Sequence, residues 1–315
     1  MNKEEKMLDL VIIGSGPAGL TAAIYAARMK LDFIVLENEL IGGQIRATYS
    51  VENYPGFRNI SGEELINKIY NHAVDLGAKI DEFDQIENIK LTNEEKVIET
   101  YAKIYKPKSI IVASGAKYRP LPIPEEKKYH GNGIHHCELC DGKLYQDKNL
   151  IVVGGGNSAL EAAIFLSRYA KNITMIHQFD YFQGEKSLQD EVFNNSKIKI
   201  IWNTEIRNAL GEDKLEEVLV EDLKTKEQYK IKADGIFVYI GMVPNTDLYK
   251  NHLNLNEKGY ILGNEDTKTN IEGVFVAGDV RVKQFRQLVT ANADGAIAAL
   301  SSEKYISEKR RESNG

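Results

Sequence analysis

The stretch LDLVIIGSGPAGLTAAIYAARMKLDFIVLE, residues 8–37, decides the fold expected for this chain. Its apolar run at residues 8–13 predicts a buried strand, and the glycines that follow predict a tight turn. Residues 18–30 have the apolar spacing and the residue types of a helix, and residues 31–37 read as a second buried strand. Strand, turn, helix and strand within about thirty residues predict a βαβ unit on a parallel sheet.

The glycines of this unit have the spacing of a dinucleotide-binding turn. Gly14, Gly16 and Gly19 stand where the chain must bend sharply, approach a pyrophosphate and pack a helix on a strand. Glu37, at the end of the second strand, can accept hydrogen bonds from ribose hydroxyls. A lone glycine motif is weak evidence, but here the strand, the helix and the acidic residue surround it. We therefore expect a nucleotide site rather than an ordinary glycine-rich loop.

A second unit of the same kind follows at residues 149–177, NLIVVGGGNSALEAAIFLSRYAKNITMIH. Its turn contains Gly154, Gly156 and Ala159, and the alanine still permits close helix packing. His177 stands where the first unit has its acidic residue, 23 positions after the first glycine in both units. It supplies neither the carboxylate that suits an NAD ribose nor the guanidinium fork that suits a 2′-phosphate. This site either binds a nicotinamide cofactor loosely or has lost its nucleotide function.

The order of these units predicts an α/β chain of two Rossmann-like, three-layer nucleotide-binding domains, the second inserted into the first. Proline-bearing stretches at 119–124 and 241–246 bracket the second unit and are expected to be linkers, because proline lacks the amide donor of a continuing strand. We expect the first domain at 1–116 and 247–315, and the second at 117–246. Further strands are expected at 109–115, 198–204, 215–223, 233–241 and 273–280, and helices at 62–77 and 286–307.

The two cysteines of the chain, Cys137 and Cys140, stand three residues apart. This scarcity and spacing favour a reducing compartment and a redox dithiol, in which one sulfur attacks a partner disulfide and the other resolves the mixed disulfide. Asp141 is placed to shuttle the proton of this chemistry, or to cap a helix. One alternative is a metal site with His135 and His136, disfavoured because adjacent side chains in a strand point to opposite faces. The other is a pair of unreactive buried thiols.

Two further site candidates lie towards the C-terminus. Asp279 closes an apolar run, which places a carboxylate at the carboxyl end of a strand, where open α/β sheets bind ligands. Arg286 and Gln287 open the last expected helix, whose N-terminal amides can meet a cofactor. A plain turn followed by a helix cap is the alternative.

Charge and composition narrow the class of partners. The net charge is −6 and the basic residues are scattered, so we expect no nucleic acid partner. The charged first residues and the lack of a long apolar run indicate neither secretion nor a membrane span, and we expect a cytoplasmic protein. The basic tail at 307–315 is expected to be a frayed, solvated terminus.

Over nearly its whole length the chain resembles the low-molecular-weight thioredoxin reductases, which are FAD-dependent disulfide oxidoreductases. The dithiol position separates it from the larger glutathione-reductase relatives, whose dithiol lies in the first glycine unit, and from ferredoxin-NADP reductases, which lack one. The matching strings are GSGPAGL (14–20), IGGQ (41–44), VENYPGF (51–57), ASGA (113–116), CELCDG (137–142), VVGGGNSALEAA (152–163), IGMVPNT (240–246), GVFVAGDV (273–280) and RQLVTANADGAIAAL (286–300).

The resemblance implies that FAD and a Cys137/Cys140 disulfide reduce a thioredoxin-like protein, with Cys140 facing the flavin, Cys137 attacking thioredoxin and Asp141 as acid and base. It also implies a homodimer and a rotation of the middle domain. The implied flavin contacts are Gly14, Gly16, Ala18, Gly19, Glu37, Gln44, Asn53, Asp279, Arg286 and Gln287. The pyridine-nucleotide turn would use Gly154, Gly156, Ala159 and His177.

The electron donor is the open question. NADPH-dependent members of the family carry His-Arg-Arg and a further arginine, whereas this chain has His177, Gln178, Phe179 and Gln183. That pattern is similar to the ferredoxin-linked branch, in which a one-electron donor reduces the flavin. NADPH and reduced ferredoxin both stay open, with NADH a third candidate. An alternative of another class is a flavin-binding redox sensor or interaction protein without turnover.

Overall fold

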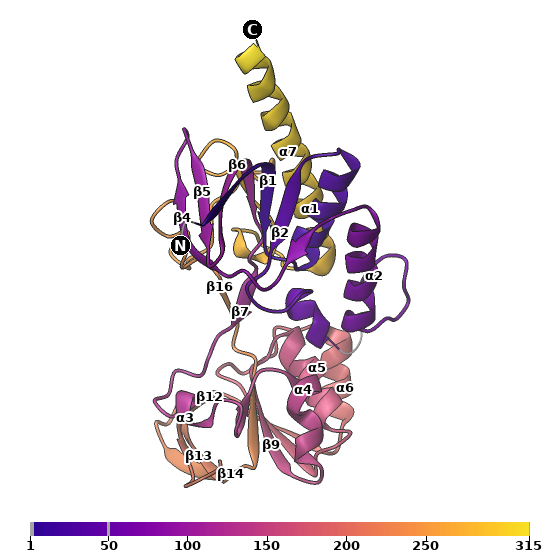
Figure 1. Cartoon of the computed structure of the whole chain (residues 1–315). Coiled ribbons are helices and arrows are strands. Elements are labelled where there is room, and N and C mark those ends of the chain that lie inside the picture. Colours follow the sequence, from indigo (N-terminus) through magenta and orange to yellow (C-terminus); the bar gives the residue numbers. More distant parts are fainter. Residues whose placement is uncertain (1–2, 49–50, 315) are drawn as a thin grey trace. The chain divides into compact units, whose positions relative to one another are not determined.

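The computed structural model describes residues 3–48 and 51–314 (Figure 1). The chain divides into two compact units, one formed by residues 1–117 with 243–315 and the other by residues 118–242. Each unit has its own parallel sheet and helices, so the expected α/β fold class is confirmed. Among the described helices, none is long and apolar enough to cross a membrane.

The first unit is built on a seven-stranded sheet in the order β3-β2-β1-β6-β5-β4, with β17 paired to β6. Its parallel strands are β1 (Glu4–Ile13), β2 (Phe33–Leu36), β3 (Ile80–Asp81), β6 (Lys103–Val112) and β17 (Val274–Val276). An antiparallel hairpin, β4 (Ile86–Leu91) and β5 (Lys96–Thr100), extends the sheet and was not among the expected strands. The helical segments are α1 (Pro17–Arg28), η1 (Gly43–Ala47), α2 (Gly62–Asp75), η3 (Gly278–Val280) and α7 (Leu288–Asn314).

The sheet of the first unit has an apolar core on each face, which explains the unbroken apolar run of β1. Leu10 packs with residues of α1 and α7, whereas its neighbour Val11 packs with Tyr249 and Ile261 in a separate cluster. Successive side chains of a strand point to opposite faces, so a strand buried on both faces must be apolar throughout.

The C-terminal helix α7 extends much further than expected. Arg310 Nη2 lies 2.7 Å from both carboxylate oxygens of Asp9, a buried residue of β1. Lys108 donates a hydrogen bond to the same carboxylate at 2.9 Å. The helix continues to Asn314, so the prediction of a frayed terminus was wrong, whereas the expected solvation agrees with the exposed residues 310–312. Residue 315 lies outside the described residues.

The second unit has a five-stranded parallel sheet in the order β11-β10-β9-β15-β8. These strands are β8 (Ile134–His135), β9 (Asn149–Val153), β10 (Asn172–Ile176), β11 (Ile198–Ile201) and β15 (Gly235–Val238). The helical segments are α3 (Glu126–Tyr129), α4 (Glu138–Asp141), η2 (Gly142–Tyr145), α5 (Asn157–Leu166) and α6 (Lys186–Asn194). A three-stranded antiparallel sheet contains β12 (Thr204–Leu210), β13 (Glu217–Asp222) and β14 (Gln228–Lys232). The series β9, α5, β10 repeats β1, α1, β2, which confirms the repeat seen in the sequence.

The chain passes between the units at β7 (Ala116–Tyr118) and β16 (Met242–Pro244), which pair with each other. The second proline-bearing stretch is therefore not a plain linker, because part of it is a strand. Pro244 is the last residue of that strand, where the missing amide donor is tolerated.

Candidate active site and nucleotide turns

The first glycine turn joins β1 to α1. Gly14 has a φ of 104°, and a Cβ on it would lie 2.3 Å from the carbonyl oxygen of Ala113. A Cβ on Gly19 would lie 1.8 Å from the carbonyl oxygen of Gly14. Glycine is therefore required at both positions. Gly16 is the N-cap residue of α1, so the free amides of that helix open onto the turn.

Glu37 lies beside this turn, directly after β2. Its Oε2 accepts hydrogen bonds from the amide and the hydroxyl of Ser15, both at 2.7 Å. Its Oε1 accepts from the amide of Glu39 at 2.8 Å. These bonds hold the carboxylate at the carboxyl end of the sheet, and it retains acceptor capacity for a ligand hydroxyl.

Asp279, in η3, brings a second carboxylate to the same edge of the first sheet. Its Oδ1 is buried and has no hydrogen-bond partner among the described residues. Burial raises the pKa of Asp279, while the cations of Lys283 and Arg286 oppose that rise. A buried acceptor left unpaired costs about 1–3 kcal/mol. This oxygen is therefore suited to a donor from a bound group.

The other expected flavin contacts lie in the same unit. A Cβ on Gly278, beside Asp279, would lie 2.9 Å from Cβ of Ala18 in α1. Asn53 Nδ2 donates to Gln287 Oε1 at 3.1 Å. The guanidinium carbon of Arg286 lies 3.9 Å from the ring centre of Tyr260. Gln44 follows Gly43, where a Cβ would lie 3.4 Å from Cα of Gly16.

Asp294, in α7, supports the Asp279 turn and was missed by sequence reasoning. Its Oδ2 accepts from the amide of Gly278 at 3.0 Å and lies 2.6 Å from Lys283 Nζ. Its Oδ1 lies 3.3 Å from Arg281 Nη1. The only signal in the sequence is an aspartate in the alanine-rich stretch LVTANADGAIAAL (288–300) of the last helix.

The second glycine turn repeats the backbone of the first. Gly154 has a φ of 132°, and a Cβ on it would lie 2.2 Å from the carbonyl oxygen of Tyr239. Gly156 is the N-cap residue of α5, and Ala159 is fully buried in its first turn. The backbone shape of a nucleotide turn is therefore retained.

His177 fills the space beside the second turn. It is 4% exposed, and a Cβ on Gly155 would lie 2.5 Å from its Nε2. Its ring packs against Phe182 and Trp202, with ring centres 6.0 Å and 6.2 Å away. Burial lowers the pKa of His177, which favours the neutral ring. This side chain packs in the core and brings no positive charge to the turn.

The loop after β10 closes over the same turn. The amides of Gln183 and Gly184 both donate to the carbonyl oxygen of Gly155, at 2.8 Å and 3.1 Å. Glu185 Oε1 accepts from Asn157 Nδ2 at 3.0 Å, at the start of α5. A carboxylate therefore stands at the helix end that would face a pyrophosphate, where a negative charge is unfavourable to that ligand.

Cys137 and Cys140 form a disulfide at the carboxyl end of β8. Cys137 is the N-cap residue of α4, and its Sγ accepts from the amide of Cys140 at 3.1 Å. Because β8, β15 and β9 are parallel, the dithiol and the Gly154 turn share one edge of the second sheet. Tyr239 joins them, since its carbonyl oxygen abuts that turn and its hydroxyl donates to Glu138.

Asp141 lies at the end of a buried polar chain that sequence reasoning missed. His135 Nε2 lies 2.7 Å from the hydroxyl of Tyr145 and 3.3 Å from the amide of Gly133. The amide can only donate, so Nε2 carries the lone pair and the ring hydrogen is on Nδ1. That atom lies 3.0 Å from Asp141 Oδ2, although the two are not aligned as a hydrogen bond. Burial lowers the pKa of His135 and raises that of Tyr145 to about 12, so both are neutral at pH 7.

His135 and His136 face opposite sides of the sheet, as expected from strand geometry. The ring of His135 stacks on Phe237 at 5.3 Å, whereas His136 stacks on Tyr118 at 6.1 Å. The two histidines and two cysteines therefore do not converge on one metal ion.

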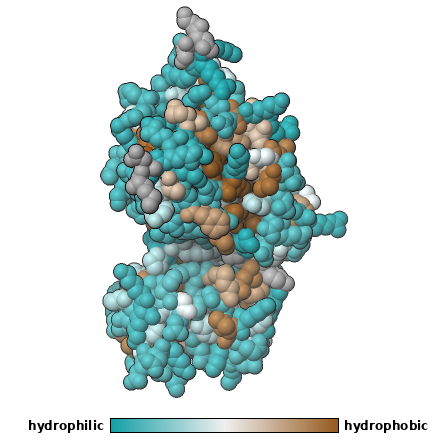
Figure 2. Space-filling model, in the orientation of Figure 1, coloured by the Kyte–Doolittle hydropathy of each residue, from teal (hydrophilic) through white to brown (hydrophobic). Residues whose placement is uncertain are grey.

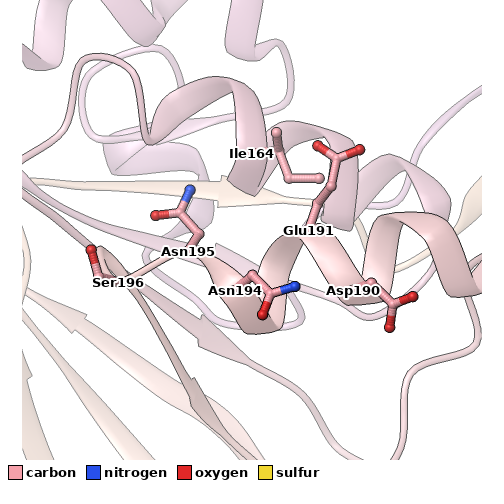
Figure 3. Close-up of a pocket in the computed structure, with 6 residues that line it drawn as sticks. All are labelled: Ile164, Asp190, Glu191, Asn194, Asn195 and Ser196. Carbon is pink, nitrogen blue, oxygen red and sulfur yellow. The ribbon is translucent and has the colours of Figure 1, made fainter.

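A separate surface pocket lies at the end of α6 (Figure 3). It contains no residue singled out from the sequence and no thiol, and we assign it no role. Its lining residues are Ile164, Asp190, Glu191, Asn194, Asn195 and Ser196.

Similarity to known proteins agrees with this geometry. A profile of the family described as pyridine nucleotide-disulphide oxidoreductase matches residues 8–295. The chain belongs to this family. A relative from Clostridium pasteurianum, named "34.2 kDa protein in rubredoxin operon", is 62% identical over 98% of this chain and 100% of its own. The thioredoxin reductase of Bacillus subtilis (strain 168) is 42% identical over 97% of this chain and 96% of its own.

Solved structures of family members are also similar. Thioredoxin reductase from Lactococcus lactis has a TM-score of 0.92 and 37% identity, covering 96% of this chain and 99% of that one. A ferredoxin-flavin thioredoxin reductase from Clostridium acetobutylicum has a TM-score of 0.52 and 28% identity, with coverage of 96% and 99%. This chain is accordingly an FAD-dependent disulfide oxidoreductase of the low-molecular-weight thioredoxin reductase type.

The first glycine turn fits the FAD that the family requires. A side chain at Gly14 or Gly19 would collide with the backbone, so only glycine permits the close packing of this turn. Such a turn is the one on which a pyrophosphate binds. The unpaired Oδ1 of Asp279 lies at the same edge of the sheet and lacks only a donor. The residues present are therefore compatible with a bound flavin dinucleotide.

Proposed function

We propose that this protein is a cytoplasmic thioredoxin-disulfide reductase whose FAD receives electrons from a one-electron iron–sulfur protein of the ferredoxin type. The choice of donor rests on the charges at the second glycine turn. His177 is neutral there, and the Glu185 carboxylate lies at the start of the helix. A 2′-phosphate carries close to two negative charges and is normally met by guanidinium groups. Where NADPH-dependent members of the family carry these guanidinium groups, this chain has Gln178, Phe179 and Gln183.

One similar structure supports a donor of this class. The similar structure from Clostridium acetobutylicum is that of a ferredoxin-flavin thioredoxin reductase.

We propose that the first unit holds FAD through the residues that line its turn. Glu37 would accept from ribose hydroxyls, the amides at the start of α1 would face the pyrophosphate, and Asp279 would accept a ligand hydroxyl. The remaining proposed contacts are Gly14, Gly16, Ala18, Gly19, Gln44, Asn53, Arg286 and Gln287. When bound, FAD supplies an electron pair to the Cys137–Cys140 disulfide.

The second unit then carries out thiol–disulfide exchange. Reduction breaks the Cys137–Cys140 bond, and the Cys137 thiolate attacks a disulfide sulfur of thioredoxin, which releases one thioredoxin thiolate. Asp141 takes the proton from Cys140 Sγ, and that sulfur attacks the mixed disulfide, which releases the second thioredoxin sulfur. The enzyme disulfide is restored, and thioredoxin has gained the electron pair, which two molecules of the one-electron donor supply to the flavin. Asp141 returns its proton to one thioredoxin thiolate, and solvent supplies the second proton.

We propose a second copy of this chain as the occupant of an apolar face on the first unit. Figure 2 shows apolar groups on the side of this unit that carries its helices. Exposed large side chains on the helices of this unit include Tyr25 of α1 (37% exposed) and Ile297 and Leu300 of α7 (37% and 51%). The spacing of the last two places them on one face of the helix. Sedimentation of wild type and Leu300→Glu tests this, since a dimer would dissociate in the variant.

Anaerobic flavin titration tests the donor. We expect the FAD absorbance to bleach with photoreduced ferredoxin and not with NADPH or NADH. Rapid bleaching by micromolar NADPH would overturn the proposed donor. Added thioredoxin should then reoxidise the flavin and gain thiols. In Cys140→Ser, ferredoxin should still bleach the flavin while thioredoxin stays oxidised. Bleaching of wild type without any thioredoxin reduction would instead favour a redox sensor.

A further inference from the structure

Three potential metal ligands from two segments of the second unit converge on one side of β8. They are Glu126 in α3, His130 directly after it and His136 directly after β8. His136 Nε2 lies 3.2 Å from Glu126 Oε1, and His130 Nδ1 lies 3.5 Å from the same oxygen. The three ligand atoms lie within 4.8 Å of one another. None of these three residues belongs to the disulfide or to either glycine turn.

The orientation of His136 turns a lone pair towards the carboxylate. Both ring nitrogens face groups that can only accept: Nδ1 lies 3.3 Å from the carbonyl oxygen of Val238, and Nε2 lies 3.2 Å from Glu126 Oε1. A neutral ring has one hydrogen, and when that hydrogen is on Nδ1 it is donated to Val238. In the neutral ring, Nε2 is then an acceptor that faces another acceptor, Glu126 Oε1. Metal-binding histidines are held in this way, with the second ring nitrogen donating to a backbone carbonyl. A cation between the two acceptors would satisfy both.

The carboxylate of Glu126 is buried and incompletely paired. The residue is 7% exposed, and its Oε2 has no hydrogen-bond partner among the described residues. A buried carboxylate is unfavourable unless a positive charge accompanies it. His130 is largely exposed, so an ion can reach the cluster from solvent on that side.

The backbone holds the cluster in place without an ion. Tyr129 is 1% exposed, and its hydroxyl donates to the carbonyl oxygen of Gly211 at 2.6 Å, which anchors α3. The chain then turns, with the amide of Gly131 donating to the carbonyl oxygen of Ile134 at 2.9 Å. This turn brings the rings of His130 and His136 to 5.6 Å.

We propose that Glu126, His130 and His136 form a binding site for a divalent transition-metal ion of the zinc class. Two imidazoles and one carboxylate suit Zn²⁺, Co²⁺ or Ni²⁺ rather than Mg²⁺ or Ca²⁺. Ligand bonds of about 2.0–2.2 Å in a tetrahedron place ligand atoms roughly 3.3 Å apart. The contacts of 3.2 Å and 3.5 Å are of that size. The fourth position is open, and an ion there would fix the segment that leads into Cys137.

Calorimetric titration of the FAD-loaded, oxidised enzyme with Zn²⁺ tests the site after chelator treatment and dialysis. Oxidised enzyme is used because its two cysteines, being bonded to each other, cannot bind the ion. We expect one site per chain, weakened by about tenfold or more in Glu126→Gln and in His130→Asn. His130 is exposed, so its replacement leaves the core intact.

His72→Asn is the matched control, because this histidine lies exposed on α2 of the first unit. It should bind Zn²⁺ as the wild type does. Flavin content and the melting temperature of each ion-free variant show that it is folded. No saturable binding by wild type, or equal binding by wild type, Glu126→Gln and His130→Asn, would overturn the proposed site. This outcome leaves the proposed reductase activity untouched, since the disulfide and flavin turn do not include these residues.

Discussion

The two glycine turns of this protein share a backbone and differ in the charges placed around it. At the first turn, Ser15 donates to the Glu37 carboxylate, and Asp279 Oδ1 has no hydrogen-bond donor among the described residues. At the second, the His177 ring packs against Gly155, and Glu185 stands at the helix start. A repeated βαβ unit therefore keeps its backbone shape without keeping the groups that bind a nucleotide. Those groups are side chains that follow the second strand of each unit.

Exchanging the small residues of the two turns should have the largest effect. In Gly19→Ala the new Cβ would lie 1.8 Å from the Gly14 carbonyl oxygen, so the turn must shift, which costs about 1–3 kcal/mol or more. We expect FAD to be lost, and activity with it, measured as flavin absorbance per protein. The matched change Ala159→Gly should keep the flavin and cost about 1 kcal/mol of unfolding free energy. A Gly19→Ala enzyme with full flavin content would contradict the conclusion that FAD binding requires the close packing of the first turn.

Adding positive charge to the second turn should have an intermediate effect. Gln178, Phe179 and Gln183 are exposed, and replacing all three with arginine adds guanidinium groups at the cost of the ring contact between Phe179 and His177. Each charge-assisted hydrogen bond to the 2′-phosphate is worth about 1.5 kcal/mol or more, or about tenfold in affinity. We expect stopped-flow bleaching by NADPH to appear in the triple variant.

NADH is the internal control for that experiment, since it lacks the 2′-phosphate and should gain little. If NADPH bleaches the flavin of the triple variant no faster than that of wild type, the loop after β10, and not the missing positive charge, prevents NADPH from binding at the second turn. That result would show that the two turns differ in nucleotide binding because of their shape and not because of their charge.

The smallest effect concerns the helix that backs the first turn. Burial would raise the pKa of Asp9, but hydrogen bonds from Lys108, the Asp32 amide and Arg310 outweigh it, and the pKa is lowered. The stability this provides is present above the unfolded pKa of about 3.9 and is lost as pH falls through the folded value. Arg310 is half exposed, so we expect Arg310→Ala to cost at most about 1 kcal/mol at pH 7.

Urea unfolding of the flavin-loaded enzyme at several pH values from 7 down to about 3 measures this difference, which should stay constant to about pH 5 and shrink below it. The neighbouring exposed Arg311 supplies the control, Arg311→Ala, for which we expect no change. A deficit of the same size at every pH would show that Arg310 contributes by packing and not through Asp9.

Much of the fold and part of the site could be predicted from local pattern. Both βαβ units and the helix at 62–77 follow from apolar periodicity, and the disulfide follows from two cysteines at a redox spacing. The hairpin β4–β5 was missed, although its burial alternates along β5, because short half-buried strands give a weak signal. The tail of α7 was misjudged because its partner Asp9 lies 301 residues away in the chain.

By itself, the sequence determined where the chain turns, which strands are buried on both faces and which two sulfurs can exchange, because periodicity and covalent spacing are local properties. Only the tertiary structure decided the surroundings of those sulfurs. Pairing of β8 with β15 turns His135 towards Tyr145 and Asp141, and His136 towards Glu126. Parallel strands bring residues far apart in the chain to one edge, and no local pattern records which side chains meet there.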